Sequence, residues 1–249
     1  SAFVNQKTKA YTALRLSPRH ALWFAGLAAL LSILGVTLVT AAHRFPEVAL
    51  LEVFADLFDL NGEANAPSWY ASSLWLIAAA LAFLIGQSEH GKHGRFIWNW
   101  GMFCGACIFL SADEATMIHE RIGKGISVIF EKWESLRMDG GWFYSWMYWG
   151  IGFLSVFLFL NYQFLLALPR KTLFLLCVSG VVFISGAIGV ELFSAWDEHG
   201  IRPINSARQW FLLIALEESL EMAGVVALIY TLLDYICISK VDIVIEGQS

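Results

Sequence analysis

The chain has 249 residues, of which 58% are hydrophobic and only 15% are charged. Together with a mean hydropathy of +0.62, this composition excludes an ordinary soluble domain and indicates an integral membrane protein. The net charge of −5, with basic residues scattered along the chain, gives no reason to expect a nucleic-acid partner.

The chain begins with a basic segment. Residues 1–20 carry four basic side chains, Lys7, Lys9, Arg15 and Arg19. Ser17-Pro18 predicts the start of a helix, and the first predicted span, residues 20–42, is long enough to cross ~30 Å of hydrocarbon. Beyond it, Arg44 is the only basic residue up to position 67. By the positive-inside rule, this asymmetry places the N-terminus in the cytoplasm.

An amphipathic stretch and a turn-rich link separate the first two spans. Between residues 46 and 60, apolar and acidic residues alternate at helical spacing, which predicts a helix lying on the outer membrane interface. The link at 61–67 is rich in Asn, Gly and Pro, and it precedes the second predicted span at 69–86. Glu63 lies in this link, which is a candidate lid that would add one carboxylate to a site beneath it.

The third predicted span, residues 96–119, ends in a run of polar residues that includes Asp113, Glu114, His119 and Glu120. A charged side chain at membrane depth costs roughly 2.5–3.5 kcal/mol, so such residues usually have a partner or a function. A second interfacial helix is predicted to follow at 122–136.

Cys104 and Cys107 have the spacing of a redox or metal motif in the middle of this span. We interpret these small residues as part of a helix-packing face. All four cysteines lie within or at the edge of apolar runs, so they do not form the pattern of a disulfide framework.

The rest of the chain is predicted to form three more spans, at residues 144–168, 172–196 and 207–236. The fifth span carries Glu191, and the sixth carries Glu217, Glu218 and Glu221. The predicted fold is an all-α membrane bundle of six transmembrane helices plus two outer interfacial helices. It forms a single domain, residues 1–249, with both termini in the cytoplasm.

The acidic residues of three spans are predicted to meet in the outer half of the bundle. With a rise of 1.5 Å per residue, Asp113 and Glu191 lie ~26 and ~28 Å above the inner ends of their spans. Glu217 and Glu221 share a helix face, ~10 and ~16 Å below the outer end of theirs. His119 is about 120° from Asp113 around the helix, so both can bind one ion only if the helix end bends or loosens.

Three arrangements would make such a group of acids stable at low dielectric. The first is a metal site, because carboxylates with one histidine suit one or two divalent ions of iron, manganese, zinc or magnesium. The second is a proton or cation pathway in which some acids are neutral. The third is structural, with Arg121, Arg202 or Arg208 neutralising the acids. We favour the metal site, whose candidate ligands are Asp113, Glu114, His119, Glu120, Glu191, Glu217, Glu218 and Glu221.

Four sequence pieces carry most of the unusual polar residues. They are Asn61-Gly-Glu63 with Pro67-Ser-Trp69, Asp113-Glu-x4-His-Glu120, Gly186-Ala-Ile-Gly-x-Glu191 and Glu217-Glu-x-x-Glu-Met222. In these pieces the chain resembles an uncharacterised family of bacterial six-helix integral membrane proteins. The resemblance implies only that these pieces occur together, and it implies no activity. We expect the protein to be an integral protein of the bacterial inner membrane.

The leading hypothesis from the sequence is a membrane-embedded, metal-dependent enzyme that acts on a lipid or another apolar small molecule. Hydrolysis by a metal-bound water and oxidation at a two-iron centre both fit the residue types. The alternatives are a proton or cation transporter and a non-enzymatic accessory subunit of a larger membrane complex. The lack of internal repeats and of matching Pro- or Gly-broken spans argues against a transporter. The expected partners are membrane lipids and other membrane subunits.

Overall fold

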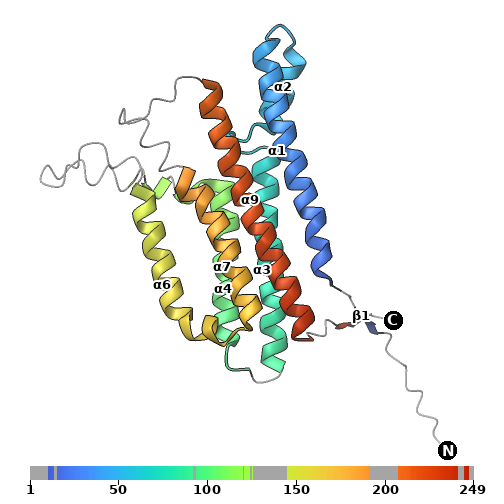
Figure 1. Ribbon diagram of the computed structural model, residues 1–249, viewed down its shortest axis with the longest axis vertical. Helices are drawn as coiled ribbons and strands as arrows, with labels where there is room; N and C mark the ends of the chain where they lie inside the picture. Colours follow the sequence, from blue (N-terminus) through green and yellow to red (C-terminus); the bar gives the residue numbers. More distant parts are fainter. Residues whose placement is uncertain are drawn as a thin grey trace, which may run out of the picture.

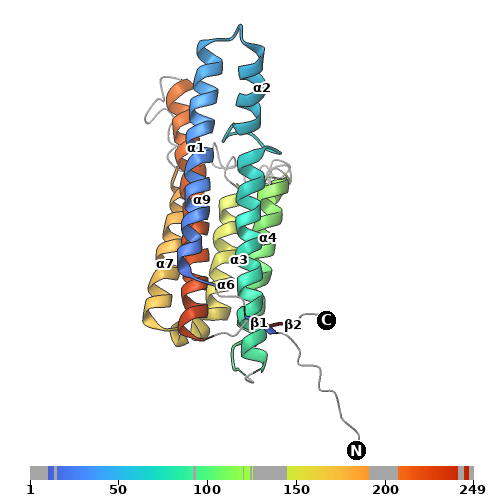
Figure 2. The same ribbon diagram turned by 90° about the vertical axis from the view of Figure 1, so that its right-hand side faces the viewer.

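The structure is a computed structural model that describes residues 11–13, 16–91, 94–119, 121–123, 125, 145–190, 207–240 and 244–246. In these ranges the chain is almost entirely helical, and the long helices run side by side as an elongated bundle (Figure 1). The strands β1, Tyr11–Ala13, and β2, Val244–Glu246, pair antiparallel. The described parts nearest to the two chain ends therefore meet at one end of the bundle, which we call the termini end (Figures 1 and 2).

The first helix begins where the sequence predicts it. Ser17 Oγ accepts a hydrogen bond from the Arg19 N–H, and the Ser17 N–H donates to His20 Nδ1, so a capping box opens the short 3-10 turn η1, Pro18–His20. The long helix α1, Ala21–Arg44, follows. The later helices are α2, Ala49–Phe58; α3, Ala66–Gly91; α4, Ile97–Thr116; α6, Ser145–Ala167; α7, Arg170–Ile184; the π-helical segment η4, Ser185–Val190; and α9, Ala207–Ile238.

Four helical stretches of the described chain are long and apolar enough to cross a membrane. They are Pro18–Arg44, Ala66–Ser88, Gly150–Ala167 and Arg170–Val190. Neither α4 nor α9 is among the four. Two acidic residues lie on α4 and four lie on α9. The fold is therefore a helical bundle compatible with a membrane.

The position of α2 differs from the sequence prediction of a helix lying on the interface. Figure 2 shows α2 running parallel to the long axis of the bundle, beside α1 and above α3. The segments α2 and α3 therefore follow one another along the side of α1. Gly35 permits this packing, because a Cβ atom there would lie 2.5 Å from the Phe58 carbonyl oxygen. Ala55 is the buried residue of α2, whereas Leu50 and Val53 are exposed. Most of the second predicted interfacial helix, 122–136, lies outside the described residues.

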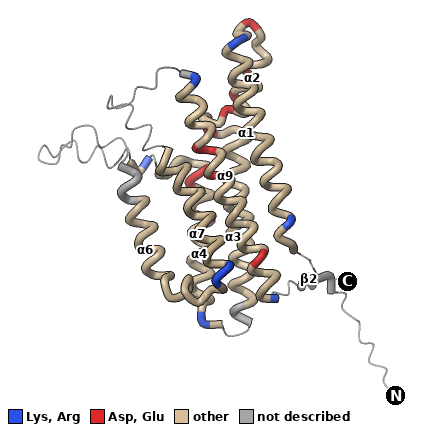
Figure 3. Tube along the Cα trace, viewed as in Figure 1, with Lys and Arg blue, Asp and Glu red and all other residues tan. Residues whose placement is uncertain are grey.

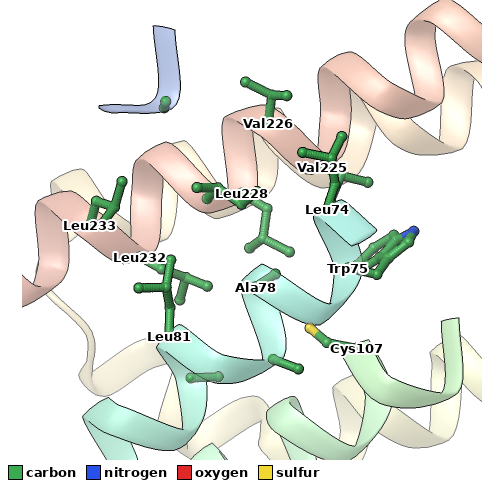
Figure 4. Close-up of a cluster of buried hydrophobic side chains, with 14 of the residues drawn as sticks. Leu74, Trp75, Ala78, Leu81, Cys107, Val225, Val226, Leu228, Leu232 and Leu233 are labelled. Atoms are coloured by element: carbon green, nitrogen blue, oxygen red, sulfur yellow. The ribbon is translucent and has the colours of Figure 1, made fainter. Parts of the chain in front are cut away.

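The core is formed where α3 packs between α4 and α9. Leu74, Ala78 and Ile85 of α3 are fully buried, and Figure 4 shows α3 side chains facing Cys107 of α4 and a row of apolar residues on α9. The buried position of Cys107 agrees with a packing role. Because lipid is as apolar as these side chains, close packing, more than the hydrophobic effect, holds such helices together in a bilayer.

Helix α6 stands at the side of the bundle and is separated from the other helices by more space (Figure 1). Aromatic rings connect it to α4: Phe164 contacts Trp100 at a centroid distance of 5.0 Å, and Phe153 contacts Phe109 at 5.6 Å. Only 11% of the residues in its apolar stretch, Gly150–Ala167, are buried. In a bilayer, most of this helix surface would contact acyl chains.

Charges are distributed unevenly along the bundle. Figure 3 shows most acidic positions in the half away from the termini end. Basic residues also lie near the termini end, in η1, just before α4, at the start of α7 and just after α9. The fold thus separates an acidic half from a basic end.

Candidate functional site

The end of α4 folds His119 back onto Asp113. The helix stops at Thr116, and Met117 adopts a left-handed conformation with φ 52° while its N–H donates to the Asp113 carbonyl oxygen. The Asp113 carboxylate then accepts the His119 N–H at Oδ1, at 2.7 Å, and its Oδ2 lies 2.8 Å from His119 Nδ1. The helix end therefore bends at Met117, as it must if Asp113 and His119 are to meet.

This pairing determines how His119 can act. A metal-binding histidine usually has its second ring nitrogen hydrogen-bonded to a carboxylate, which orients the ring and selects the tautomer. With Nδ1 on Asp113, Nε2 is the atom of His119 that would bind a metal ion. Asp113 would then orient the ligand instead of binding the ion itself.

The break between α2 and α3 is a structured loop held by Asn65. The Asn65 side chain is buried, and its Nδ2 donates to the carbonyl oxygens of Asp59, at 2.6 Å, and Gly62, at 2.7 Å. Its Oδ1 accepts the Ser68 N–H at the start of α3. The loop that carries Glu63 is therefore fixed at both of its ends by one amide side chain.

Acidic residues from this loop, α4 and α9 lie close enough to interact electrostatically. Glu114 interacts with Glu63, Asp113 and His119. Glu218 interacts with Glu114, Glu217 and Glu63. We call Glu63, Asp113, Glu114, Glu217 and Glu218 the acid group. Its members come from three separate chain segments, and Glu63 is the member that the sequence suggested only as part of a lid.

The π-helical segment η4 packs against the turn of α9 that carries the acids. A Cβ atom at Gly186 would lie 2.7 Å from the Glu217 carbonyl oxygen and 2.9 Å from Glu221 Cγ. Glu221 thus lies one turn from Glu217 and faces Gly186. Short π-helical segments occur often at functional sites. The acid group therefore lies between two interruptions of regular helix, η4 and the α2–α3 break.

The depth of the acid group follows from a contact between α9 and α1. Ser219 Oγ, next to Glu218, donates to Ser32 Oγ at 2.9 Å. Ser32 is near the middle of α1, ~16 Å from its first residue. Along α9, Glu218 is ~24 Å from Asp234 near the termini end. The acids of α9 therefore lie nearer to the end of the bundle opposite the termini, where they are half-buried, whereas Glu63 is exposed.

The predicted metal ligands are only partly tested by this geometry. Glu120 and Glu191, and also Arg202, lie outside the described residues. Within the described ranges, no three His, Cys, Asp or Glu side chains lie close enough together to hold one metal ion. Arg121 and Arg208 are exposed, and neither forms an ion pair within the same ranges.

The structure also contains polar pairs that sequence reasoning missed. Lys171 Nζ lies 2.7 Å from Oδ1 of the buried Asp234, near the termini end. Ser72 and Ser111 exchange hydrogen bonds between α3 and α4, one turn from Glu114. In the sequence, each of these residues is visible only as a polar residue within or beside an apolar run. Such a residue indicates a buried polar group but does not identify its partner.

Comparisons with known proteins give one match. No curated protein and no solved structure matches the chain. Residues 13–236, which include every described helix from η1 to α7 and nearly all of α9, match a family described as a domain of unknown function, DUF8692. The chain therefore belongs to the DUF8692 family.

Proposed function

We propose that His119 and the members of the acid group other than Asp113 bind one or two divalent metal ions, and that the protein is a membrane-embedded metal-dependent enzyme acting on a lipid or another apolar small molecule. The observation that carries the proposal is the convergence of acids from the 59–65 loop, α4 and α9 beside the oriented pair Asp113–His119. Several carboxylates at low dielectric repel one another unless a cation or protons compensate them.

The proposed ligands have different roles. His119 and Glu114 on α4 and Glu218 on α9 would bind the ion, and Asp113 would orient His119. Glu217, Glu221 and Glu63 would complete the site, with Glu120 and Glu191 from outside the described residues. Since the described side chains are too far apart to hold one ion together, metal binding would draw α4 and α9 closer and would contribute to folding stability.

The chemistry of the donors limits the reaction. Oxygen-rich ligands with one imidazole suit iron, manganese, zinc or magnesium. Such an ion activates water for hydrolysis, and an iron pair supports oxidation. A half-buried site level with the middle of α1, beside helices whose surfaces are apolar, favours a substrate that enters from the lipid phase.

The proposal includes six membrane-spanning helices, with α4 and α9 added to the four apolar ones, and both termini in the cytoplasm of a bacterium. An even number of spans agrees with β1 and β2 pairing at one end of the bundle. The basic residues near that end support a cytoplasmic location by the positive-inside rule.

A second candidate function is proton or cation transfer through the membrane. The observation that favours it is that both the α2–α3 break and η4 border the acid group. Transporters often build their ion sites from interrupted helices near the membrane midplane. This function needs no permanently bound metal ion.

Metal content and thermal unfolding test the proposal. The purified protein should contain one or two equivalents of a divalent metal by elemental analysis, and a chelator should lower its melting temperature. Metal present at 100 times its dissociation constant adds ~2.7 kcal/mol of stability. Glu218→Gln should lose the metal and the response to the chelator. Glu52→Gln, at an exposed acid on α2, is the matched control and should keep both.

A wild-type protein that contains no metal, and whose melting temperature does not change with chelator or with added iron, manganese, zinc or magnesium, contradicts the enzyme proposal. A proton or cation flux in liposomes that is lost in Glu218→Gln would then support the second candidate.

A further inference from the structure

A second site lies far from the acid group, between α4 and α6 near the termini end. A cavity of about 340 Å³ opens there. One wall is formed by the start of α4 and the two residues before it, and the other by the last turns of α6. The volume is at the small end of the range for ligand pockets, about 300–1,000 Å³. The cavity can therefore hold the head of a ligand whose remaining part lies outside.

The mouth of the cavity presents a guanidinium group. Arg95 Nη2 donates to Gln163 Oε1 at 3.2 Å, and Gln163 Nε2 donates to the Tyr162 hydroxyl at 2.9 Å. The guanidinium also lies over the Phe96 ring, 5.4 Å from its centroid. Within the described residues, no carboxylate pairs with Arg95. In the described part of the chain, neutral groups therefore hold the Arg95 guanidinium at the mouth of the cavity, and no carboxylate neutralises its charge.

Polarity changes along the helix direction, away from the termini end. Asn99, in the first turn of α4, lies four residues after Arg95, and its Nδ2 donates to Oδ1 of the buried Asn161 at 2.9 Å. Beside it, Phe159 and Leu160 of α6 are 74% and 56% exposed. The cavity therefore presents a cation, then an amide, then apolar side chains along one direction.

This order matches the chemistry of a phospholipid. A phosphate, the ester groups of glycerol and the acyl chains follow one another over a similar path. Arginine is suited to phosphate because its planar fork can donate two parallel hydrogen bonds. Basic pockets between transmembrane helices on the cytoplasmic side are typical sites for anionic lipid headgroups.

We propose that the cavity between α4 and α6 binds an anionic phospholipid, with its phosphate on Arg95 and its acyl chains along Phe159 and Leu160 of α6. The lipid occupies this cavity and connects α6 to α4. The inference is independent of the metal site, because it uses other residues at the opposite end of the bundle.

The test measures lipid binding to the purified full-length protein in detergent. The probes are short-chain phosphatidylglycerol, short-chain phosphatidylcholine and inorganic phosphate. Phosphatidylglycerol should bind at least tenfold more tightly than either of the other two. Arg95→Gln should weaken this binding about tenfold, which corresponds to ~1.4 kcal/mol, and Arg95→Lys should weaken it less.

The matched control is Arg170→Gln, which removes an exposed arginine at the start of α7 near the same end of the bundle. It should leave binding unchanged. Should Arg95→Gln fail to fold, Gln163→Leu removes the support of the guanidinium at an exposed position and should also weaken binding.

Three results would each overturn the proposal. They are equal binding of the two lipids, equal losses in the Arg95 and Arg170 variants, and binding of inorganic phosphate as tight as that of phosphatidylglycerol. The last result would assign the cavity to a free phosphate.

Discussion

Gly186 of η4 lies directly against the backbone of Glu217 on α9, because a Cβ atom at position 186 would come within 2.7 Å of the Glu217 carbonyl oxygen. A second glycine, Gly224, permits a similar approach of α9 to Phe183. These two contacts bring α7 and η4 against the turn of α9 that carries the acid group.

Substitution of Gly186 tests this packing. Gly186→Ala should lower the free energy of unfolding by about 1–3 kcal/mol, because the added methyl group meets backbone that cannot move aside. Gly180→Ala is the control on the preceding helix α7, where an added Cβ meets nothing within 4 Å. Thermal unfolding should show a lower melting temperature for the first variant only. Equal melting temperatures would show that η4 and α9 are not in this close contact.

Asn65 should be required for the α2–α3 break. Asn65→Ala leaves the Asp59 and Gly62 carbonyl oxygens without this donor, which should cost about 1–3 kcal/mol of stability. Asn61→Ala changes an exposed side chain of the same loop and should have little effect. If both variants unfold like the wild type, the loop is not held by this amide.

Asp113 should tune metal binding through His119. If the metal proposal is right, Asp113→Asn should weaken metal affinity by about 10–100-fold, because the carboxylate that orients the imidazole is lost. Asp56→Asn, an exposed change on α2, should not alter the affinity. Metal titration of the two variants measures the difference. A larger loss, with no binding at all, would mean that Asp113 is itself a ligand.

The Lys171–Asp234 pair should behave as a buried charge with its counterion. Lys171→Met should destabilise the protein, because it leaves the Asp234 carboxylate buried without a cation. The double variant Lys171→Met with Asp234→Leu should be more stable than Lys171→Met alone. Arg170→Met, at the neighbouring exposed arginine, is the control and should be near neutral. A double variant that is less stable than both single variants would argue against this electrostatic account.

The proposed topology predicts which positions are accessible in intact cells. In a variant without native cysteines, a cysteine at Glu52 on α2 should react with a membrane-impermeant reagent from outside. A cysteine at Lys240, just after α9, should react only after the membrane is opened. The reverse labelling pattern would invert the orientation, and labelling of both positions from outside would exclude six spans with both termini inside.

Local sequence determines most of the helices. Apolar runs near 20 residues long predict α1, α3, α6 and α7 because each run can satisfy its backbone hydrogen bonds only within itself in lipid. Ser17-Pro18 predicts where the first helix starts, for the same local reason: a serine side chain and a proline both suit the unpaired N–H groups of a first turn. The acids of α4 and α9 are also identified by sequence, since their cost in an apolar run is independent of the partner.

Tertiary structure alone decides how these pieces meet. Helix α2 packs along α1 because Gly35 of α1 leaves room for the Phe58 carbonyl group. The sequence of α2 alone does not predict that contact. His119 reaches Asp113 because Met117 adopts a left-handed conformation. Methionine rarely adopts this conformation, and no residue pattern in the sequence predicts it. Glu63 joins Glu114 and Glu218 through a loop held by Asn65. Hydropathy acts on each segment separately, whereas these contacts depend on two or three distant segments at once.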